Sequence, residues 1–445
     1  MSAPEQPIVQ TSSGAVRGVW RHGPAGSSAA FLGVPFAMAP VGALRFAAPV
    51  PREPWAGVRD ASTYGPTAQK APLAEVTTIP EPSTPGDDVL NLCVFTPCPG
   101  DDLARLPVLV WIHGGGFIAG CQNSPWYDGA AFNRDGVVTV SLGYRLGIEG
   151  WLHVDGAPDN RGALDWVAGL EWVRHNIAAF GGDPDRVTVA GQSAGGGAVL
   201  TLLGIPGATG LFHGALAISG ATGTASSTAA AEAVAARFTE ITGWPATAQA
   251  LADVGGEELH AAAVELTSSG ATGLGLAPWV DGTVITQAPA DAVANGPGRG
   301  VPLVLGFTAH EFGDGDRQVV TDAVFRRPGL TLAELRARDA DAHGGAATWL
   351  YQFEWRSTAP ATGGIAFHCL DLPFGWDCLA AERVEAATGA HPPQHLADAV
   401  HGAWVRFVRD ADPGWPPYRS GSRTTRVWDD PVADVADRLR ELREA

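Results

Sequence analysis

The sequence predicts an α/β protein built on one mostly parallel central sheet flanked by helices. Short apolar runs typical of buried strands are spread through the chain, near residues 107–112, 137–142, 186–190, 215–219 and 301–307. Helical patterns lie between these runs, as the crossovers of a parallel sheet require. The 445 residues are 45% hydrophobic, enough for a sizeable core. Length alone would favour about two or three domains, but the alternation of strands and helices predicts a single α/β domain over residues 1–445.

Two segments carry a clear helical period. Between the second and third strand runs, apolar residues recur at helical spacing at Leu164, Val167, Leu170, Val173 and Ile177. A similar pattern in the tail predicts a helix docked on the core, through Leu396, Val400, Trp404, Phe407 and Val408. Helical accessory regions are expected at about 221–300 and 315–365, the first with patches at Ala229–Thr242 and Glu257–Leu266.

A G-x-S-x-G pentapeptide, Gly191–Gly195, follows the apolar run Val187–Ala190 and precedes the helix-permissive Ala198–Leu203. A sharp turn from strand to helix strains the central residue and exposes its side chain, so its neighbours must be small. Ser193 is therefore the candidate nucleophile. The alternative is a glycine-rich connection that contains a serine without a catalytic role.

A second glycine-rich loop supports a catalytic role. The strand predicted at 107–112 ends in His113-Gly114-Gly115-Gly116-Phe117, the type of loop that supplies oxyanion amides in acyl transfer. We assign the donors to the amides of Gly115, Gly116 and Ala194, and expect His113 to hydrogen-bond the loop. A plain turn or a phosphate cradle is the alternative, but no Gly-Lys-Ser/Thr follows.

These motifs resemble those of the type-B carboxylesterase family of α/β-hydrolases. The resemblance extends over most of the chain, through Phe31–Phe36, Pro40–Phe46, Ser141–Gly147 and Phe180–Gly196. It implies an α/β-hydrolase fold with helical insertions around the active-site entrance. It also implies a carboxylic ester hydrolase that needs neither cofactor nor metal.

The resemblance also indicates the partners of Ser193, because the triad of this fold follows the order serine, acid, histidine. Glu311 stands in the acid position of the loop Thr308–Gly313, and His368 stands in the loop before Leu372-Pro373-Phe374. Asp314 and Asp316 are alternatives for the acid. The other histidines considered for the base are His113, His310, His391, His395 and His401.

The predicted reaction is hydrolysis of neutral carboxylic esters through an acyl-enzyme, with water as the second substrate. Gln192 stands where cholinesterases carry a glutamate, which favours uncharged substrates. Candidate pocket residues are Gln192, Phe117, Trp126, Tyr127 and Phe374, and a core position is the alternative for each of the four aromatic residues. Two other functions remain open: an amidase or carbamate hydrolase with the same triad, and a non-catalytic cholinesterase-like interaction protein.

The chain carries a formal charge of −18, which disfavours nucleic acid and anionic membranes as partners. No stretch has the pattern of a signal peptide or a membrane span. The five cysteines fit reduced thiols better than a disulfide framework, and Asp87-Asp88-Val89-Leu90 replaces the cysteine motif of secreted relatives. We therefore expect a cytoplasmic protein, with the oligomeric state open between a monomer and a weak dimer.

Overall fold

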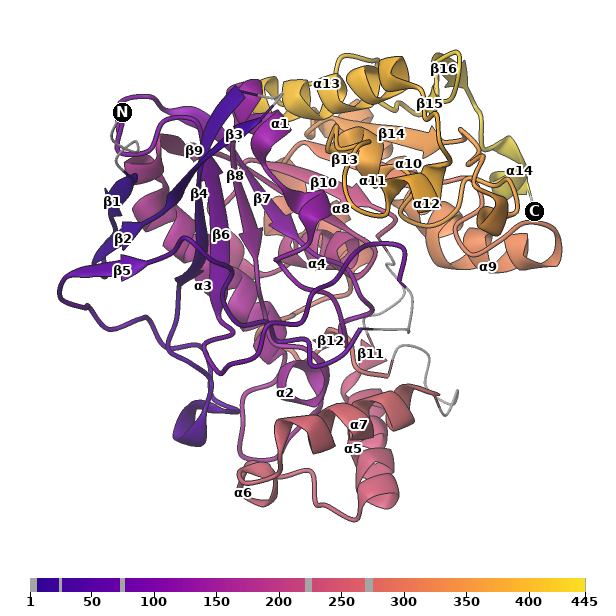
Figure 1. Cartoon of the computed structure of the whole chain (residues 1–445). Helices are drawn as coiled ribbons and strands as arrows, with labels where there is room; N and C mark the ends of the chain where they lie inside the picture. The colour runs from indigo at the N-terminus through magenta and orange to yellow at the C-terminus, as the bar shows by residue number, and fades with distance from the viewer. Residues whose placement is uncertain (1–5, 24–25, 73–76, 221–225, 269–274, 445) are drawn as a thin grey trace.

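A central sheet of 11 strands organises the molecule, in the order β16-β15-β14-β13-β10-β9-β7-β8-β6-β4-β3 (Figure 1). The structure is a computed structural model and describes residues 6–23, 26–72, 77–220, 226–268 and 275–444. The parallel strands are β7 (Leu106–Ile112), β8 (Val138–Leu142), β9 (Gly182–Gln192), β10 (Gly214–Ile218), β13 (Leu303–Thr308), β14 (Thr348–Phe353) and β15 (Thr424–Trp428). The five predicted strand runs are confirmed.

Both edges of the sheet are antiparallel, so the sheet is mixed. Three strands near the N-terminus extend it beyond β8, and one closes the other edge: β3 (Val19–Gly23), β4 (Gly26–Pro35), β6 (Asn91–Thr96) and β16 (Ala433–Ala436). Two small sheets lie apart, formed by β1 (Ile8–Gln10), β2 (Ala15–Arg17) and β5 (Val58–Asp60), and by β11 (Ser226–Ser227) and β12 (Trp279–Val280).

Side chains of the central strands alternate between two hydrophobic cores. Along β7, Val108, Val110 and Ile112 join one core, whereas Leu109 and Trp111 join the other. The first core contains α3 (Arg161–Asn176), α4 (Ala194–Leu202) and α10 (Arg327–His343), and the second contains α13 (Gln394–Asp410). A parallel sheet covered on both faces explains why its strands are apolar throughout. The predicted helices at 164–177 and 396–408 are confirmed as α3 and α13.

The first accessory region is largely helical, and its first three helices gather in a lobe beside the sheet, whereas its last helix packs against α10 and α4 (Figure 1). It contains α5 (Thr228–Thr242), α6 (Ala248–Leu251), α7 (Gly256–Ser268) and α8 (Pro289–Asn295), while 221–225 and 269–274 lie outside the described residues. The second region, 315–365, is helical through α9 (Gln318–Thr321), a π-helical turn (Asp322–Arg326) and α10, and then supplies β14 to the central sheet. Because β14 belongs to the central sheet, this region is not wholly a helical insertion.

The remaining helices are short: α1 (Ala130–Arg134), α2 (Gly147–Trp151), α11 (Leu372–Gly375), α12 (Val384–Thr388) and α14 (Arg440–Glu444). No helix in the described ranges has the length and apolar character to cross a membrane. All five cysteines fall within those ranges and are free thiols, as the sequence predicts.

A buried ion pair ties the segment after β8 to α3. Arg145 and Asp165 have side chains only 2% and 0% exposed. The guanidinium donates to both carboxylate oxygens, at 2.7 and 2.8 Å, and the Arg145 amide adds a third bond at 3.0 Å. Because every donor meets an acceptor, the pair offsets the cost of burying two charges.

Candidate active site

Ser193 lies on the turn between β9 and α4, with φ 59° and ψ −122°. A residue with a side chain rarely adopts this conformation, so neighbouring contacts must hold it. The Ser193 amide donates to the Ile218 carbonyl, and its carbonyl accepts from the Gly197 amide, both at 2.9 Å. A Cβ on Gly195 would collide with the Ile112 carbonyl. The glycines of the pentapeptide are therefore required by packing.

The glycine loop after β7 lies directly against this turn. A Cβ built on Gly114 would be 3.2 Å from the Ser193 Cβ. Gly115 and Gly116 have φ of 109° and 62°, and a Cβ on Gly115 would collide with the Ala119 carbonyl. Within the described ranges, the amides of Gly115, Gly116 and Ala194 have no acceptor in the protein. Three free donors thus flank the serine.

His113 supports the loop, as expected. Its ring stacks on Tyr144 with 4.5 Å between centroids, and its Nδ1 lies 2.8 Å from the Gly114 carbonyl. Burial lowers the pKa of His113 to about 4, despite the bond to that carbonyl. The ring is therefore neutral near pH 7 and donates its Nδ1 proton to the loop.

Glu311 and His368 meet at the same edge of the sheet. The buried Glu311 carboxylate follows β13, and its Oε2 lies 2.5 Å from His368 Nδ1. Its Oε1 accepts from the Ser219 hydroxyl at 2.8 Å and from the Thr308 amide at 2.9 Å. Burial alone would lower the pKa of His368, but the adjacent Cys369 thiol and Glu311 carboxylate together raise it above its ordinary value.

The alternatives for acid and base lie elsewhere. Asp314 and Asp316 are exposed on the far part of the loop. His310 contacts Arg356 and the Ala366 amide, and His395 pairs with Asp430. His401 is buried between the Gly375 carbonyl and Asp135, and His391 is exposed. Of the carboxylates and imidazoles considered, Glu311 and His368 are the two that contact each other.

The imidazole of His368 reaches the strand that carries the serine. Its Nε2 lies 3.1 Å from the Gln192 side-chain nitrogen, one residue before Ser193. In the described structure, the Ser193 hydroxyl itself has no hydrogen-bond partner. Catalytic hydrogen bonds are often long without substrate and tighten when it binds. One nitrogen of His368 thus contacts the residue next to Ser193, and the other contacts Glu311.

The predicted pocket residues divide into two groups. Gln192 contacts His368, whereas the four aromatic side chains are each at most 2% exposed. Phe117 packs on Trp151 and Trp166, Trp126 and Tyr127 lie in the second core, and Phe374 packs on Phe353 and Trp355. The structure thus assigns these four to the core, the alternative given for each.

Two features of the site have no counterpart in the sequence predictions. Ser219, just after β10, donates to the Glu311 carboxylate. The Phe312 ring contacts the His368 ring at a tilt of 40°, with 5.0 Å between centroids, and Phe312 is 47% exposed. Its exposed apolar neighbours along the chain are Val319 and Val320. The position of Ser219 at the carboxyl end of a strand beside β9 was a usable signal, since ligands bind at this edge.

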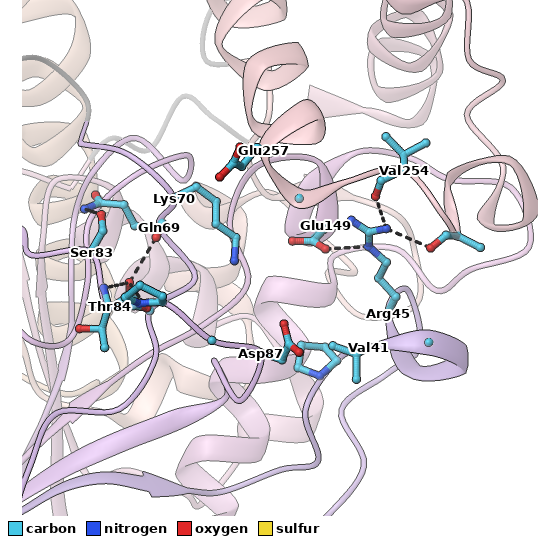
Figure 2. Close-up of a pocket in the computed structure, with 17 residues that line it drawn as sticks. Val41, Arg45, Gln69, Lys70, Ser83, Thr84, Asp87, Glu149, Val254 and Glu257 are labelled. Carbon is cyan, nitrogen blue, oxygen red and sulfur yellow. Dashed lines mark hydrogen bonds and ion pairs between the residues drawn. The ribbon is translucent and has the colours of Figure 1, made fainter.

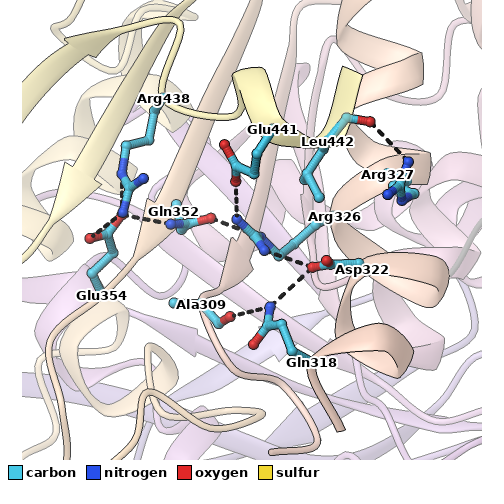
Figure 3. A network of polar contacts seen from close by, with 10 residues as sticks. All are labelled: Ala309, Gln318, Asp322, Arg326, Arg327, Gln352, Glu354, Arg438, Glu441 and Leu442. Carbon is cyan, nitrogen blue, oxygen red and sulfur yellow. Dashed lines mark hydrogen bonds and ion pairs between the residues drawn. The ribbon is translucent and has the colours of Figure 1, made fainter. Parts of the chain in front are cut away.

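A polar network connects the loop that carries Glu311 to neighbouring helices (Figure 3). Gln318 donates to the Ala309 carbonyl at 3.1 Å and to Asp322 at 3.0 Å. Asp322 in turn pairs with Arg326 at 2.6 Å, and Arg326 reaches Glu441 near the C-terminus at 2.9 Å. The backbone two residues before Glu311 is thereby anchored to α9 and α14.

A cavity of about 490 Å³ lies where the N-terminal segment meets α2 and the accessory helices (Figure 2). Arg45 spans it, pairing with Glu149 at 2.9 Å and donating to three carbonyls of residues 251–254. Gln69 on its wall accepts from the Gly120 amide at 2.5 Å. The cavity wall therefore fixes the turn that follows the glycine loop.

Comparison with known proteins agrees with this fold. The Carboxylesterase family model matches residues 5–315. Para-nitrobenzyl esterase of Bacillus subtilis is 34% identical over 98% of both chains, and phenmedipham hydrolase of Pseudarthrobacter oxydans is 31% identical over 97% of both. A solved para-nitrobenzyl esterase structure superposes with a TM-score of 0.88, at 32% identity over 99% of both chains.

The fold and the serine turn together define an α/β-hydrolase. At these identities and coverages, the chain belongs to the type-B carboxylesterase family. It is a serine carboxylesterase, an enzyme that hydrolyses carboxylic esters.

Proposed function

We propose that this carboxylesterase hydrolyses uncharged carboxylic esters with Ser193 as nucleophile, His368 as general base and acid, and Glu311 as the group that orients His368. The observation that carries the proposal is the 2.5 Å contact between Glu311 and His368. The other nitrogen of His368 contacts Gln192, the residue directly before Ser193. A carboxylate accepts only, so Nδ1 of the neutral ring carries the proton and Nε2 is free to take another. This is the tautomer that a general base requires.

In the proposed reaction, the Ser193 hydroxyl attacks the ester carbonyl carbon while its proton moves to His368 Nε2. The carbonyl oxygen becomes negative and accepts from the amides of Gly115, Gly116 and Ala194. The bond to the alcohol oxygen then breaks, and His368 returns its proton to that leaving group. Water repeats the same steps on the acyl-enzyme and releases the acid.

The free amides support the assignment of the oxyanion hole. Buried or enclosed N–H groups normally have an acceptor, so three adjacent donors without one suit a negative oxygen that arrives with the substrate. The Ala194 amide also stands at the first position of α4, where the helix favours negative charge.

Charge and polarity favour uncharged substrates. The neutral Gln192 side chain lies beside the base, and the Glu311 carboxylate is already bonded by three donors. The exposed ring that contacts His368 is apolar, namely that of Phe312. An ester with apolar groups fits these surroundings better than an ionic one. A formal charge of −18 adds repulsion toward anions.

We also propose that the enzyme acts in the cytoplasm, as a monomer or weak dimer, with no nucleic-acid or membrane partner. Five free thiols suit a reducing compartment. The acidic surface charge opposes binding to polyanions. Sedimentation of the purified enzyme across a concentration series tests the oligomeric state.

Rapid mixing with p-nitrophenyl acetate tests the proposed nucleophile. We expect deacylation to be slower than acylation, so the wild type should release a burst of nitrophenol equal to the enzyme concentration as the acyl-enzyme accumulates. Ser193→Ala should show no burst, while the control Ser141→Ala, a buried serine whose hydroxyl has no partner in the described structure, should retain it. A full burst from folded Ser193→Ala would refute the assignment. Matched p-nitroanilide and carbamate substrates compare ester, amide and carbamate hydrolysis.

A further inference from the structure

The Gln192 side chain occupies the nitrogen that the proposed mechanism uses. Gln192 is the last residue of β9 and is 1% exposed. Its side-chain nitrogen lies 3.1 Å from His368 Nε2, while His368 Nδ1 faces Glu311. With the Nδ1 proton directed at the carboxylate, Nε2 of the neutral ring has only a lone pair. The carboxamide N–H is the donor that matches it.

This contact cannot persist through the reaction. When Nε2 takes the serine proton it becomes a donor, and two N–H groups cannot hydrogen-bond to each other. A glutamine can adapt to this change, because rotation of its carboxamide places the carbonyl oxygen, an acceptor, nearly where the nitrogen was. The oxygen now lies toward Gly114, where a Cβ would be only 3.2 Å from it. The absence of a side chain at position 114 leaves room for that turn.

We propose that Gln192 is a positioning residue for the base: its carboxamide donates to the free imidazole of His368 and, after turning, accepts from the imidazolium. The inference rests on the proposed function, since it assumes that His368 is the base for Ser193. A glutamine at this place serves both protonation states. A glutamate, which only accepts when ionised, would favour the imidazolium and keep the base protonated to higher pH.

Other groups near His368 also titrate, and the test has to hold them constant. Glu311 faces Nδ1 from the loop after β13, and Cys369 and Asp371 follow on the histidine's own loop. Burial raises the pKa of Asp371 to about 7, and Tyr351 of β14 donates to its carboxylate at 2.8 Å. The rings of Phe312 and Phe325 are neutral. All of these remain in a Gln192 variant.

The test is the pH dependence of Ser193 inactivation by an uncharged fluorophosphonate, which reports the free enzyme without substrate. Gln192→Glu should move the acid limb of the inactivation rate upward by about 1–2 pH units. Gln192→Asp should move it in the same direction by less, because its carboxylate lies farther from Nε2. The control Gln352→Glu introduces the same charge at a buried glutamine bonded to Arg326 rather than to His368, and should leave the limb in place.

The outcomes separate this inference from the proposed function. If the wild type is not labelled at Ser193, the proposed function fails. If it is labelled and both Gln192 variants follow the wild-type profile, only the role of Gln192 is overturned. Equal shifts in Gln192→Glu and Gln352→Glu would also overturn it, because they would show a long-range charge effect and no direct contact. Circular dichroism of each variant confirms that it is folded.

Discussion

The Oε2 atom of Glu311 lies 2.5 Å from Nδ1 of His368, although 57 residues separate them in the chain. Glu311 follows β13 and His368 follows the next parallel strand, β14. The contact forms because the carboxyl ends of parallel strands share one edge of the sheet. The amide of His368 also donates to the Glu311 carbonyl at 2.7 Å. The two loops are thus joined by backbone as well as by side chains.

Replacing Glu311 by its neutral isostere should greatly reduce kcat without unfolding the enzyme. Glu311→Gln keeps the shape of the side chain but presents an amide to His368 Nδ1 in place of a carboxylate, which allows the wrong tautomer. We expect kcat for p-nitrophenyl esters to fall about 10³–10⁴-fold. Asp314→Asn, on the exposed part of the same loop, serves as control and should stay near wild type. A loss below tenfold in Glu311→Gln would argue against its role.

Ser219 should contribute to activity by holding the Glu311 carboxylate in place. Its hydroxyl donates to the carboxylate at 2.8 Å, and the Thr308 amide is left as the remaining donor to that oxygen in Ser219→Ala. A hydrogen bond to a charged group contributes about 1.5–3 kcal/mol, part of which is lost in the transition state, so kcat/KM should fall about tenfold. Steady-state kinetics measure the loss. Unchanged kcat/KM would mean that the hydroxyl is not needed to hold the acid.

Two adjacent glycines allow a matched test of the oxyanion loop. A Cβ on Gly115 would collide with the Ala119 carbonyl, whereas nothing lies within 4 Å of one on Gly116. Gly115→Ala should therefore displace the loop and reduce kcat about 10²–10³-fold. Gly116→Ala should reduce kcat less, because its added Cβ meets no neighbour and only the positive φ of this residue opposes it, at a conformational cost of about 1–2 kcal/mol. The order of the two kcat values is the measurement, and a reversed order contradicts this description of the loop.

The exposed ring of Phe312 should influence which esters are preferred. Its centroid lies 5.0 Å from that of His368 and it is 47% exposed, so a substrate at the base can bury it. In Phe312→Ala, the ratio of kcat/KM for butyrate over acetate esters should drop about fivefold or more. Phe312→Leu keeps an apolar side chain and should retain most of the ratio. An unaltered preference in the alanine variant would place the substrate chain elsewhere.

Removing one partner of the buried ion pair between Arg145 and Asp165 should strongly destabilise the fold. Asp165→Asn leaves a buried guanidinium without its countercharge, and should lower the free energy of unfolding by about 3–5 kcal/mol. The exposed pair Arg237–Glu240 is the comparison, and Glu240→Gln should cost less than about 1 kcal/mol. Urea unfolding midpoints measure both. Similar midpoints for the two variants would contradict the difference.

Much of the fold, and the contact between Glu311 and His368, could be predicted from the sequence for identifiable reasons. The central strands are buried on both faces, so each reads as an apolar run. Ser193 is marked by glycines that the tight turn requires, and the family pattern indicates Glu311 and His368. The strand β4 is harder to detect because Gly26–Pro35 begins with glycine, serine and alanine, and forms through pairing with its neighbours.

The aromatic pocket could not be predicted, because nearness in sequence does not tell which way a side chain points. Phe117 follows the glycine loop directly, yet its φ of 64° accompanies a ring packed on Trp151 in the core. Phe312 follows the acid, and its ring lies on the imidazole instead. Neither orientation is encoded locally, since both depend on contacts between distant segments.

A crystal structure of the enzyme after reaction with a fluorophosphonate tests the proposed site most directly. We expect the phosphorus bonded to Ser193 Oγ, its oxygen about 2.7–3.1 Å from the amides of Gly115, Gly116 and Ala194, and His368 Nε2 within hydrogen-bond distance of the adduct. A label on another residue, or a phosphoryl oxygen directed away from those amides, would contradict the account.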